Sequence, residues 1–128
     1  MTDGLADTSL FIAHESGRAL RVEALPERLA VSVITIGELR AGVLAAPDVA
    51  TRDRRLGTLT AALALDPVPV DETVAAAWAR LRVELRERGL RMPVNDSWIA
   101  ATAIALGAAV VTQADDYVEL PGLVVIHV

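Results

Sequence analysis

Acidic residues recur at separated places in the sequence, and their carboxylates are candidates for chemistry. They are Asp7, Glu38, Asp96 and the adjacent pair Asp115 and Asp116. Carboxylates that come within a few ångströms of one another repel, so some of them protonate unless a cation lies between them. Hard Mg²⁺ or Mn²⁺ prefers carboxylate and water oxygens and removes this repulsion. A metal held there activates water and stabilises charge on a phosphodiester, so the acids point to phosphodiester hydrolysis without a side-chain nucleophile.

Alternating apolar and amphipathic segments predict the elements that carry these acids. We expect strands at Gly4–Ala6, Leu29–Val33, Val68–Val70, Ala108–Val111 and Leu123–Val128. We expect helices at Leu10–His14, Thr35–Ala46, Asp48–Leu63, Asp71–Arg88 and Trp98–Leu106. Strands that alternate with helices are typical of an α/β fold, here a three-layer α/β/α sandwich with a central, mainly parallel sheet.

The predicted elements place the acids where such folds bind ligands. Asp7 directly follows the first strand, and the adjacent acidic pair follows the strand Ala108–Val111. Glu38 lies one helical turn past the second strand, and Asp96 lies at the start of a helix. Ligands of open α/β sheets gather at the carboxyl ends of the strands, so four acidic positions are predicted to meet at one edge.

Each acid also has an ordinary structural interpretation. An Asp after a strand, such as Asp7, is often only a helix cap, and a Glu inside a helix is normally a solvated surface residue. Glu38 is flanked by Ile36, Leu39 and Val43, so its surroundings are substantially apolar. Periodicity alone leaves both interpretations open.

The composition fits a single domain over residues 1–128. The chain is 53% hydrophobic with a net charge of −5, which disfavours both disorder and nonspecific coating of nucleic acid. The longest nearly apolar stretch, Ala100–Val111, is too short to span a bilayer, and no signal peptide is visible. Cysteine is absent, which excludes disulfides, thiolate metal sites and cysteine nucleophiles. We expect a cytoplasmic protein.

The absence of lysine limits the rival functions. All twelve basic residues are arginine. Receiver domains and haloacid-dehalogenase-like phosphotransferases also use an Asp after a parallel strand, but they normally employ a lysine near it. The dehalogenase-like pattern also wants a second Asp where this chain has Ser9. Glycine loops of the GxxxxGK(S/T) or GxGxxG type are absent, which disfavours a nucleotide-dependent enzyme.

Four ordered segments resemble the motifs of PIN-domain ribonucleases. They are Ala6–Ser9, Ser32–Ala41, Asn95–Ala100 and Val111–Tyr117, followed by a matching tail at Leu120–Leu123. Each motif alone is weak, but the ordered set covers essentially the whole chain. Within this family the chain looks most like the VapC-type toxins of bacterial toxin–antitoxin pairs.

The resemblance implies an activity and a set of partners. It implies an endoribonuclease that cleaves RNA, such as tRNA or rRNA, with Mg²⁺ or Mn²⁺. It also implies a VapB-like antitoxin that holds the enzyme inactive. The toxin is then expected to form a homodimer and, with the antitoxin, a heterotetramer or a larger assembly.

The resemblance also implies roles for individual residues. The catalytic acids are Asp7, Glu38, Asp96, Asp115 and Asp116, and all of them except Asp115 are expected metal ligands. Supporting roles in orienting acids or water are expected for Thr8, Ser9, Asn95 and Thr112, for which caps and strand-end hydrogen bonds are the ordinary alternative. Arg40, which trails Glu38, is a candidate contact for the RNA substrate.

The fourth motif departs from the family pattern. The family commonly places an acid two residues after the Thr, and this chain has Ala114 there. Asp115 or Asp116 can substitute through a small shift of the loop. Alternatively the fourth acid is missing, either naturally or through an engineered Asp→Ala change. The alternative function is therefore a noncatalytic PIN-fold module that acts through protein binding.

Two arginine clusters and two tryptophans have more than one interpretation. The clusters are Arg52, Arg54 and Arg55, and Arg80, Arg82, Arg86, Arg88 and Arg91. Arginines contact RNA phosphates bidentately, but a solvated helix face with pairs such as Glu84–Arg88 has the same composition. We expect Trp78 and Trp98 to be packing residues rather than platforms for bases.

Overall fold

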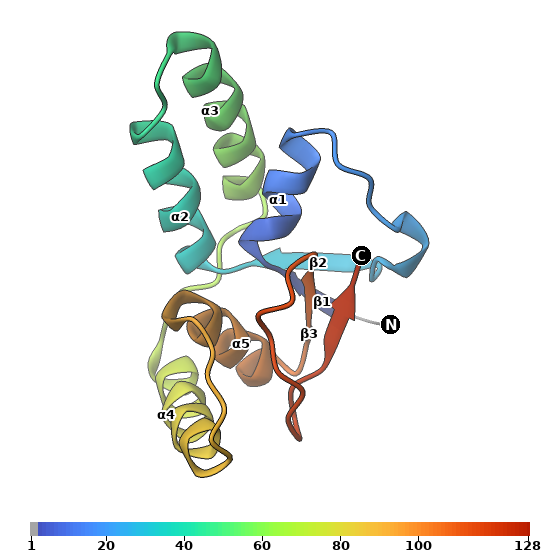
Figure 1. Ribbon diagram of the computed structural model, residues 1–128, viewed down its shortest axis with the longest axis vertical. Helices are drawn as coiled ribbons and strands as arrows, with labels where there is room; N and C mark the ends of the chain where they lie inside the picture. The colour runs from blue at the N-terminus through green and yellow to red at the C-terminus, as the bar shows by residue number, and fades with distance from the viewer. Residues whose placement is uncertain (1–2) are drawn as a thin grey trace.

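The computed structural model describes residues 3–128 and confirms the predicted three-layer α/β/α architecture (Figure 1). The strands are β1 (Asp3–Ala6), β2 (Arg28–Val31), β3 (Ala109–Thr112) and β4 (Val125–His127). The helices are α1 (Thr8–Glu15), α2 (Val33–Leu44), α3 (Val49–Leu63), α4 (Glu72–Glu87) and α5 (Val94–Leu106), with a 3₁₀ turn at Val22–Ala24. None of the described helices is long and apolar enough to cross a membrane.

The four strands form one parallel sheet in the order β2-β1-β3-β4. Ala6 pairs with Val31 on one side and with Val111 on the other, so β1, β2 and β3 end at the same level. The amide of Asp7 continues this pattern and donates to the carbonyl of Val111 at 3.0 Å. The residues that follow these strands therefore emerge at one edge of the sheet.

Alternate residues of the central strands supply two separate cores. Leu5 and Val110 are fully buried in the core formed with α4 and α5. Ala6 and Val111 belong to the opposite core, together with Leu10 of α1. Figure 1 shows α4 and α5 below the sheet and α1 above it. The period-2 alternation of a strand explains why one apolar segment serves both faces.

The antiparallel helices α2 and α3 form a hairpin beside the edge strand β2. The side chains that hold the hairpin together are buried: Val31, Ile36, Leu39, Leu59 and Ala62. The hydroxyl of Ser32 accepts a hydrogen bond from the amide of Ile34 at 3.0 Å and caps α2. This cap fixes the start of α2, and with it the place of Glu38 one turn later.

Several predicted strand boundaries are wrong. The segment Val68–Val70 is no strand, because only Val68 makes a single bridge, to Ser32. Pro67 and Pro69 lack the amide hydrogens that a longer ladder needs. The strand predicted to reach Val33 ends two residues earlier because Ser32 already caps α2.

The last strand and a turn also differ from the prediction. The strand expected over Leu123–Val128 shortens to Val125–His127, because Leu123 closes a turn by donating to the carbonyl of Leu120 at 3.0 Å. The 3₁₀ turn Val22–Ala24 was not predicted, since its sequence has no clear periodicity.

Close packing at Gly4 predicts a stability defect. A Cβ added to Gly4 would stand 2.6 Å from Cγ2 of Val111 and 2.7 Å from Cγ of Pro26. Gly4→Ala should therefore lower the free energy of unfolding by about 1–3 kcal/mol, measured by denaturant unfolding. Gly57→Ala is the matched control, because Gly57 lies in α3 with open space around its Cβ position. That change should raise stability by up to about 1 kcal/mol. Equal effects of the two substitutions would contradict this packing.

Candidate active site

Asp7 occupies the N-cap position of α1 without capping the helix. Its backbone is extended, as an N-cap requires, but its side chain accepts no hydrogen bond from the amides of the first turn. By contrast, Asp48 and Asp71 use their carboxylates to cap α3 and α4. The carboxylate of Asp7 therefore does not cap α1, although Asp7 occupies the N-cap position.

Two hydroxyl groups hold the Asp7 carboxylate instead. Ser9 donates to Oδ1 at 2.6 Å, and Thr112 at the end of β3 donates to Oδ2 at 2.7 Å. Asp7 is only 3% exposed, and this desolvation raises the pKa of its carboxyl although both hydrogen bonds oppose the shift. A buried carboxylate that is oriented at both oxygens and left without a cation counts as a candidate functional group.

The same two hydroxyls organise the loop that follows β3. The amide of Gln113 donates to Oγ of Ser9 at 3.0 Å, and the amide of Ala114 donates to Oγ1 of Thr112 at 2.8 Å. The loop carrying the last acidic residues is therefore tied directly to the residues that orient Asp7.

A third hydroxyl links the start of α1 to Glu38. Thr8 donates to Oε1 of Glu38 at 2.7 Å, and its hydroxyl lies 3.0 Å from that of the fully buried Thr35. The side chain of Glu38 is thereby drawn from α2 toward the carboxyl end of β1. The residue is half-buried, rather than a freely solvated position on a helix surface.

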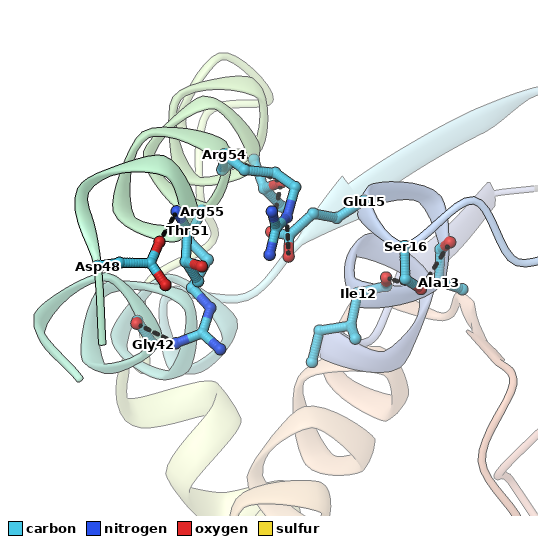
Figure 2. A network of polar contacts seen from close by, with 10 residues as sticks. Ile12, Ala13, Glu15, Ser16, Gly42, Asp48, Thr51, Arg54 and Arg55 are labelled. Atoms are coloured by element: carbon cyan, nitrogen blue, oxygen red, sulfur yellow. Dashed lines mark hydrogen bonds and ion pairs between the residues drawn. The ribbon is translucent and has the colours of Figure 1, made fainter. Parts of the chain in front are cut away.

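Polar contacts join α3 to both α2 and α1 (Figure 2). Arg55 donates to the carbonyl of Gly42 at 2.8 Å, and Arg54 lies 3.7 Å from the carboxylate of Glu15. An open pocket of about 250 Å³ lies between these helices, and Glu38 and Ile12 are among its lining residues. A surface beside the acidic site is therefore available to a partner.

The surroundings of Asp96 give the most direct sign that the separate acidic residues lie near one another. It lies in the first turn of α5 and is half-buried. Desolvation, followed by the charges of Asp116, Asp7 and Glu38, raises the pKa of Asp96 to about 6. Four carboxylates from distant parts of the sequence therefore lie within electrostatic reach of one another.

The adjacent acids Asp115 and Asp116 lie in different surroundings. Asp116 is exposed, but its charge contributes to the raised pKa of Asp96. Asp115 instead lines a separate pocket with Arg21 and His127. The geometry thus associates Asp116, rather than Asp115, with the other acids.

Tyr117 is a residue of the site for which the sequence analysis assigned no role. It is 7% exposed, and among the described residues its buried hydroxyl makes no hydrogen bond of standard geometry, although it lies close enough to the Asp7 carboxylate to affect the pKa of that group. Desolvation, then the charges of Asp7 and Asp96, raises the pKa of Tyr117, so its hydroxyl keeps its proton. The only sequence signal was its place directly after Asp116 in the fourth motif.

Two proposed supporting residues lie at the surface. Asn95 is exposed in the first turn of α5, and Pro93 rather than Asn95 occupies the N-cap. The expectation that Asn95 opens the helix is therefore wrong, because α5 already begins at Val94. Arg40 is exposed on α2, two residues beyond Glu38.

The donor set fits a hard divalent cation. Over residues 3–128, no group of three or more His, Asp or Glu side chains is placed to hold a metal ion. Mg²⁺ usually keeps several waters and binds through one or two carboxylates, so it does not require three protein ligands. The candidate donors are all carboxylate oxygens: Asp7, Glu38, Asp96 and Asp116. The orphaned hydroxyl of Tyr117 beside them offers a further polar contact for a bound water or ligand.

The comparisons with known proteins agree with the fold and with the extent of the chain. The family model for the PIN domain matches residues 5–123. "Ribonuclease VapC5" of Mycobacterium tuberculosis is 48% identical over 119 residues, covering 93% of this chain and 88% of the relative. "Ribonuclease VapC4" of the same organism is 48% identical over 129 residues, covering 97% and 95%.

A solved structure also matches along its whole length. It is a crystal structure of VapBC-5 from Mycobacterium tuberculosis, described as a member of the VapBC family of toxin–antitoxin systems. Its TM-score to this chain is 0.92 at 40% sequence identity, and the match covers 100% of both chains.

The raised pKa of Asp96 predicts a pH-dependent stability effect. Its folded pKa of about 6 exceeds the unfolded value of about 3.9, so stability falls as pH rises through that window in metal-free protein. Asp96→Asn should therefore raise the metal-free stability above pH 7 by about 1 kcal/mol, after discounting for solvent screening. Below about pH 4 the gain should vanish.

Denaturant unfolding in EDTA across this pH range measures the effect. Asp53→Asn is a matched control, because Asp53 is an exposed acid on α3. A loss of stability in Asp96→Asn that is equal at low and neutral pH would contradict carboxylate crowding.

Proposed function

This chain belongs to the PIN domain family, and from that premise we propose that it is a metal-dependent endoribonuclease, the toxin of a toxin–antitoxin pair. The observation that carries the proposal is the buried Asp7 carboxylate, which hydroxyl groups hold at both oxygens. The raised pKa of Asp96, caused by desolvation and by the charges of Asp116, Asp7 and Glu38, agrees with it. Crowded carboxylates cost stability in the free protein, and a divalent cation offsets that cost. The names of the relatives, both ribonucleases, support the same activity.

The proposed metal is Mg²⁺ or Mn²⁺, with Asp7, Glu38, Asp96 and Asp116 as its proposed ligands, one or two of them bound directly and the others through water. When bound, such an ion supplies an activated water and stabilises negative charge on the scissile phosphate. All four donors are oxygens, which favours these hard ions over metals that prefer thiolate or imidazole ligands.

The residues of the chain prepare this site by orientation. Ser9 and Thr112 fix the two oxygens of Asp7, while Thr8 fixes one oxygen of Glu38. Since these hydroxyls come from the start of α1 and the end of β3, the carboxylates are positioned before any ligand binds. Such pre-positioning lowers the reorganisation that the reaction requires.

The proposed substrate is RNA, with structured species such as tRNA and rRNA as the first to test. Arg40 is exposed on the helix that carries Glu38 and is a proposed phosphate contact. Asp115 and Asn95 remain proposed members of the site, although the geometry gives them less support than Asp116.

The proposed protein partner is a VapB-like antitoxin. The solved structure that matches this chain along its full length is described as a toxin–antitoxin family member. The pocket lined by Ile12 and Glu38 lies beside the acidic site, so a partner seated there would also cover the acids. A homodimer of the toxin within a larger complex is part of the same proposal.

A noncatalytic module is the less favoured alternative. Its support is Ala114, where the family pattern commonly has an acid. Against it stand the oriented carboxylates of Asp7 and Glu38, because a binding surface gains nothing from a desolvated, unpaired acid.

Cleavage assays on purified tRNA and rRNA test the activity. The wild-type protein should cleave with Mg²⁺ or Mn²⁺ and stop in EDTA. Asp7→Asn and Asp116→Asn should each lower the rate by more than about 100-fold, because even second-shell partners of metals contribute about 10–100-fold. Asp53→Asn is the matched control and should stay near the wild-type rate, since Asp53 is an exposed acid on α3. Equal cleavage by all variants, or cleavage unaffected by EDTA, would overturn the proposal.

Restoring the missing acid tests whether Ala114 limits the site. Ala114 is half-buried and its amide is bound to Thr112, so a carboxylate there would add a donor beside Asp7. Ala114→Asp should lower the metal concentration needed for half-maximal cleavage several-fold and reduce the stability of the metal-free protein at neutral pH. An unchanged metal requirement would show that Asp116 already supplies the fourth carboxylate.

A further inference from the structure

An open pocket of about 770 Å³ lies between the C-terminal half of α4 and the turn that leads into α5. Its lining combines three arginines with apolar side chains: Arg82, Arg86, Arg91, Leu85, Leu90 and Val94. The pocket contains no acidic residue, although the whole chain carries a net charge of −5. It is therefore a locally basic hollow on an acidic protein.

The local structure brings the three arginines together. Arg82 and Arg86 are four residues apart on α4, so they share one face of the helix. The helix ends at Glu87, and Gly89, with a φ of +66°, reverses the chain just after it. The amide of Leu90 donates to the carbonyl of Leu85 at 2.8 Å and closes the turn. This turn carries Arg91 back to the same pocket.

The three guanidinium groups are available to a ligand. None of the three forms an ion pair with a carboxylate within residues 3–128. On another face of the same helix, Arg88 pairs with Glu84 at 3.2 Å, so a neutralised arginine face is also present on α4. The charge of the pocket arginines is therefore not neutralised by a neighbouring carboxylate.

Stacked aromatic rings hold one of the arginines in place. The guanidinium of Arg82 lies 5.5 Å from the centre of the Trp78 ring, and Trp78 stacks on Trp98 of α5 with ring centres 4.3 Å apart. Trp78 is itself fixed by donating to Oγ of Ser97 at 3.0 Å. The stacking orders Arg82 before a ligand arrives and reduces the entropy lost on binding.

The pocket meets the start of α5, the helix that carries Asp96. Val94 forms part of the pocket and is the first residue of α5, while Asp96 lies in the same helical turn. Val94 is 58% exposed and Leu90 is 38% exposed, so the rim also presents apolar surface. A ligand that carries anionic groups and apolar rings, and that extends past Asp96, would complement both the arginines and the apolar rim of the pocket.

We propose that this pocket binds the phosphate backbone of the RNA strand that the acidic site cleaves, with Arg82, Arg86 and Arg91 as the phosphate contacts. The inference rests on the proposed function and adds the position of the substrate to it. Guanidinium groups bind phosphate bidentately, and their number sets how steeply RNA affinity falls with salt. The acidic site repels RNA, and a basic pocket at the start of the helix that carries Asp96 offsets that repulsion.

Fluorescence anisotropy with a labelled, mixed-sequence single-stranded RNA tests the pocket over a series of salt concentrations, in EDTA to prevent cleavage. The test variant is Arg86→Gln/Arg91→Gln, which leaves the Arg82–Trp78 contact in place. The matched control is Arg80→Gln/Arg88→Gln, which removes the same charge from outside the pocket. All four residues are exposed, so thermal unfolding should show equally stable proteins.

The pocket variant should bind RNA more weakly, and its slope of log affinity against log salt should fall by about 0.7 for each arginine removed. The control variant should keep the slope of the wild type. Equal slopes for the two double variants would overturn the inference, even if the wild type cleaves RNA. A slope change confined to the pocket variant, in a protein that does not cleave, would support the pocket and reject the proposed nuclease function. Binding of an acidic peptide, with no salt-dependent RNA binding, would also overturn it.

Discussion

Repulsion among desolvated carboxylates is the constraint on which this structure depends. Asp7 is almost completely buried, and Asp96 is half-buried within reach of three other acids. The acids lie close together because the strands that precede Asp7, Glu38 and Asp116 are parallel and end at one level. The residues that directly follow these strands therefore emerge beside one another at the same edge of the sheet. The same crowding is the basis for the proposed divalent cation, because a positive charge placed there would relieve several repulsions at once.

Hydroxyl groups, rather than arginines, hold the acids in place. Ser9, Thr112 and Thr8 bind the carboxylates of Asp7 and Glu38 through neutral hydrogen bonds. An arginine in those places would neutralise the charge and compete with a metal, whereas a hydroxyl orients the oxygens and leaves their charge available. The helix α1 consequently starts without a side-chain cap, a local loss of stability at the point where the site needs a free acid.

Acidic and basic side chains occupy separate positions around the start of α5. The first turn of α5 carries Asp96, while the turn before it and the end of α4 carry unpaired arginines. An acidic chain that acts on a polyanion needs such a division, because its net charge of −5 opposes association. Trp78 of α4 stacks on Trp98 of α5. Both are packing residues, as the sequence predicted, and the guanidinium of Arg82 lies over the Trp78 ring.

The sequence by itself determined the order of the helices and of four of the five predicted strands, the three-layer fold and the candidate acids, because these follow from local periodicity, from capping residues and from motif order. It could not determine that the segment between Pro67 and Pro69 makes only a single bridge, that α5 starts at Val94, or which acid of the pair Asp115 and Asp116 faces the site. Those depend on pairing and burial between segments far apart in the chain. The hydrogen bond from Thr112 to Asp7 spans 105 residues, and the unpartnered hydroxyl of Tyr117 becomes visible only once the surrounding acids are placed. Only the tertiary structure decided these points, since desolvation and like-charge repulsion are properties of the assembled site and not of any single segment.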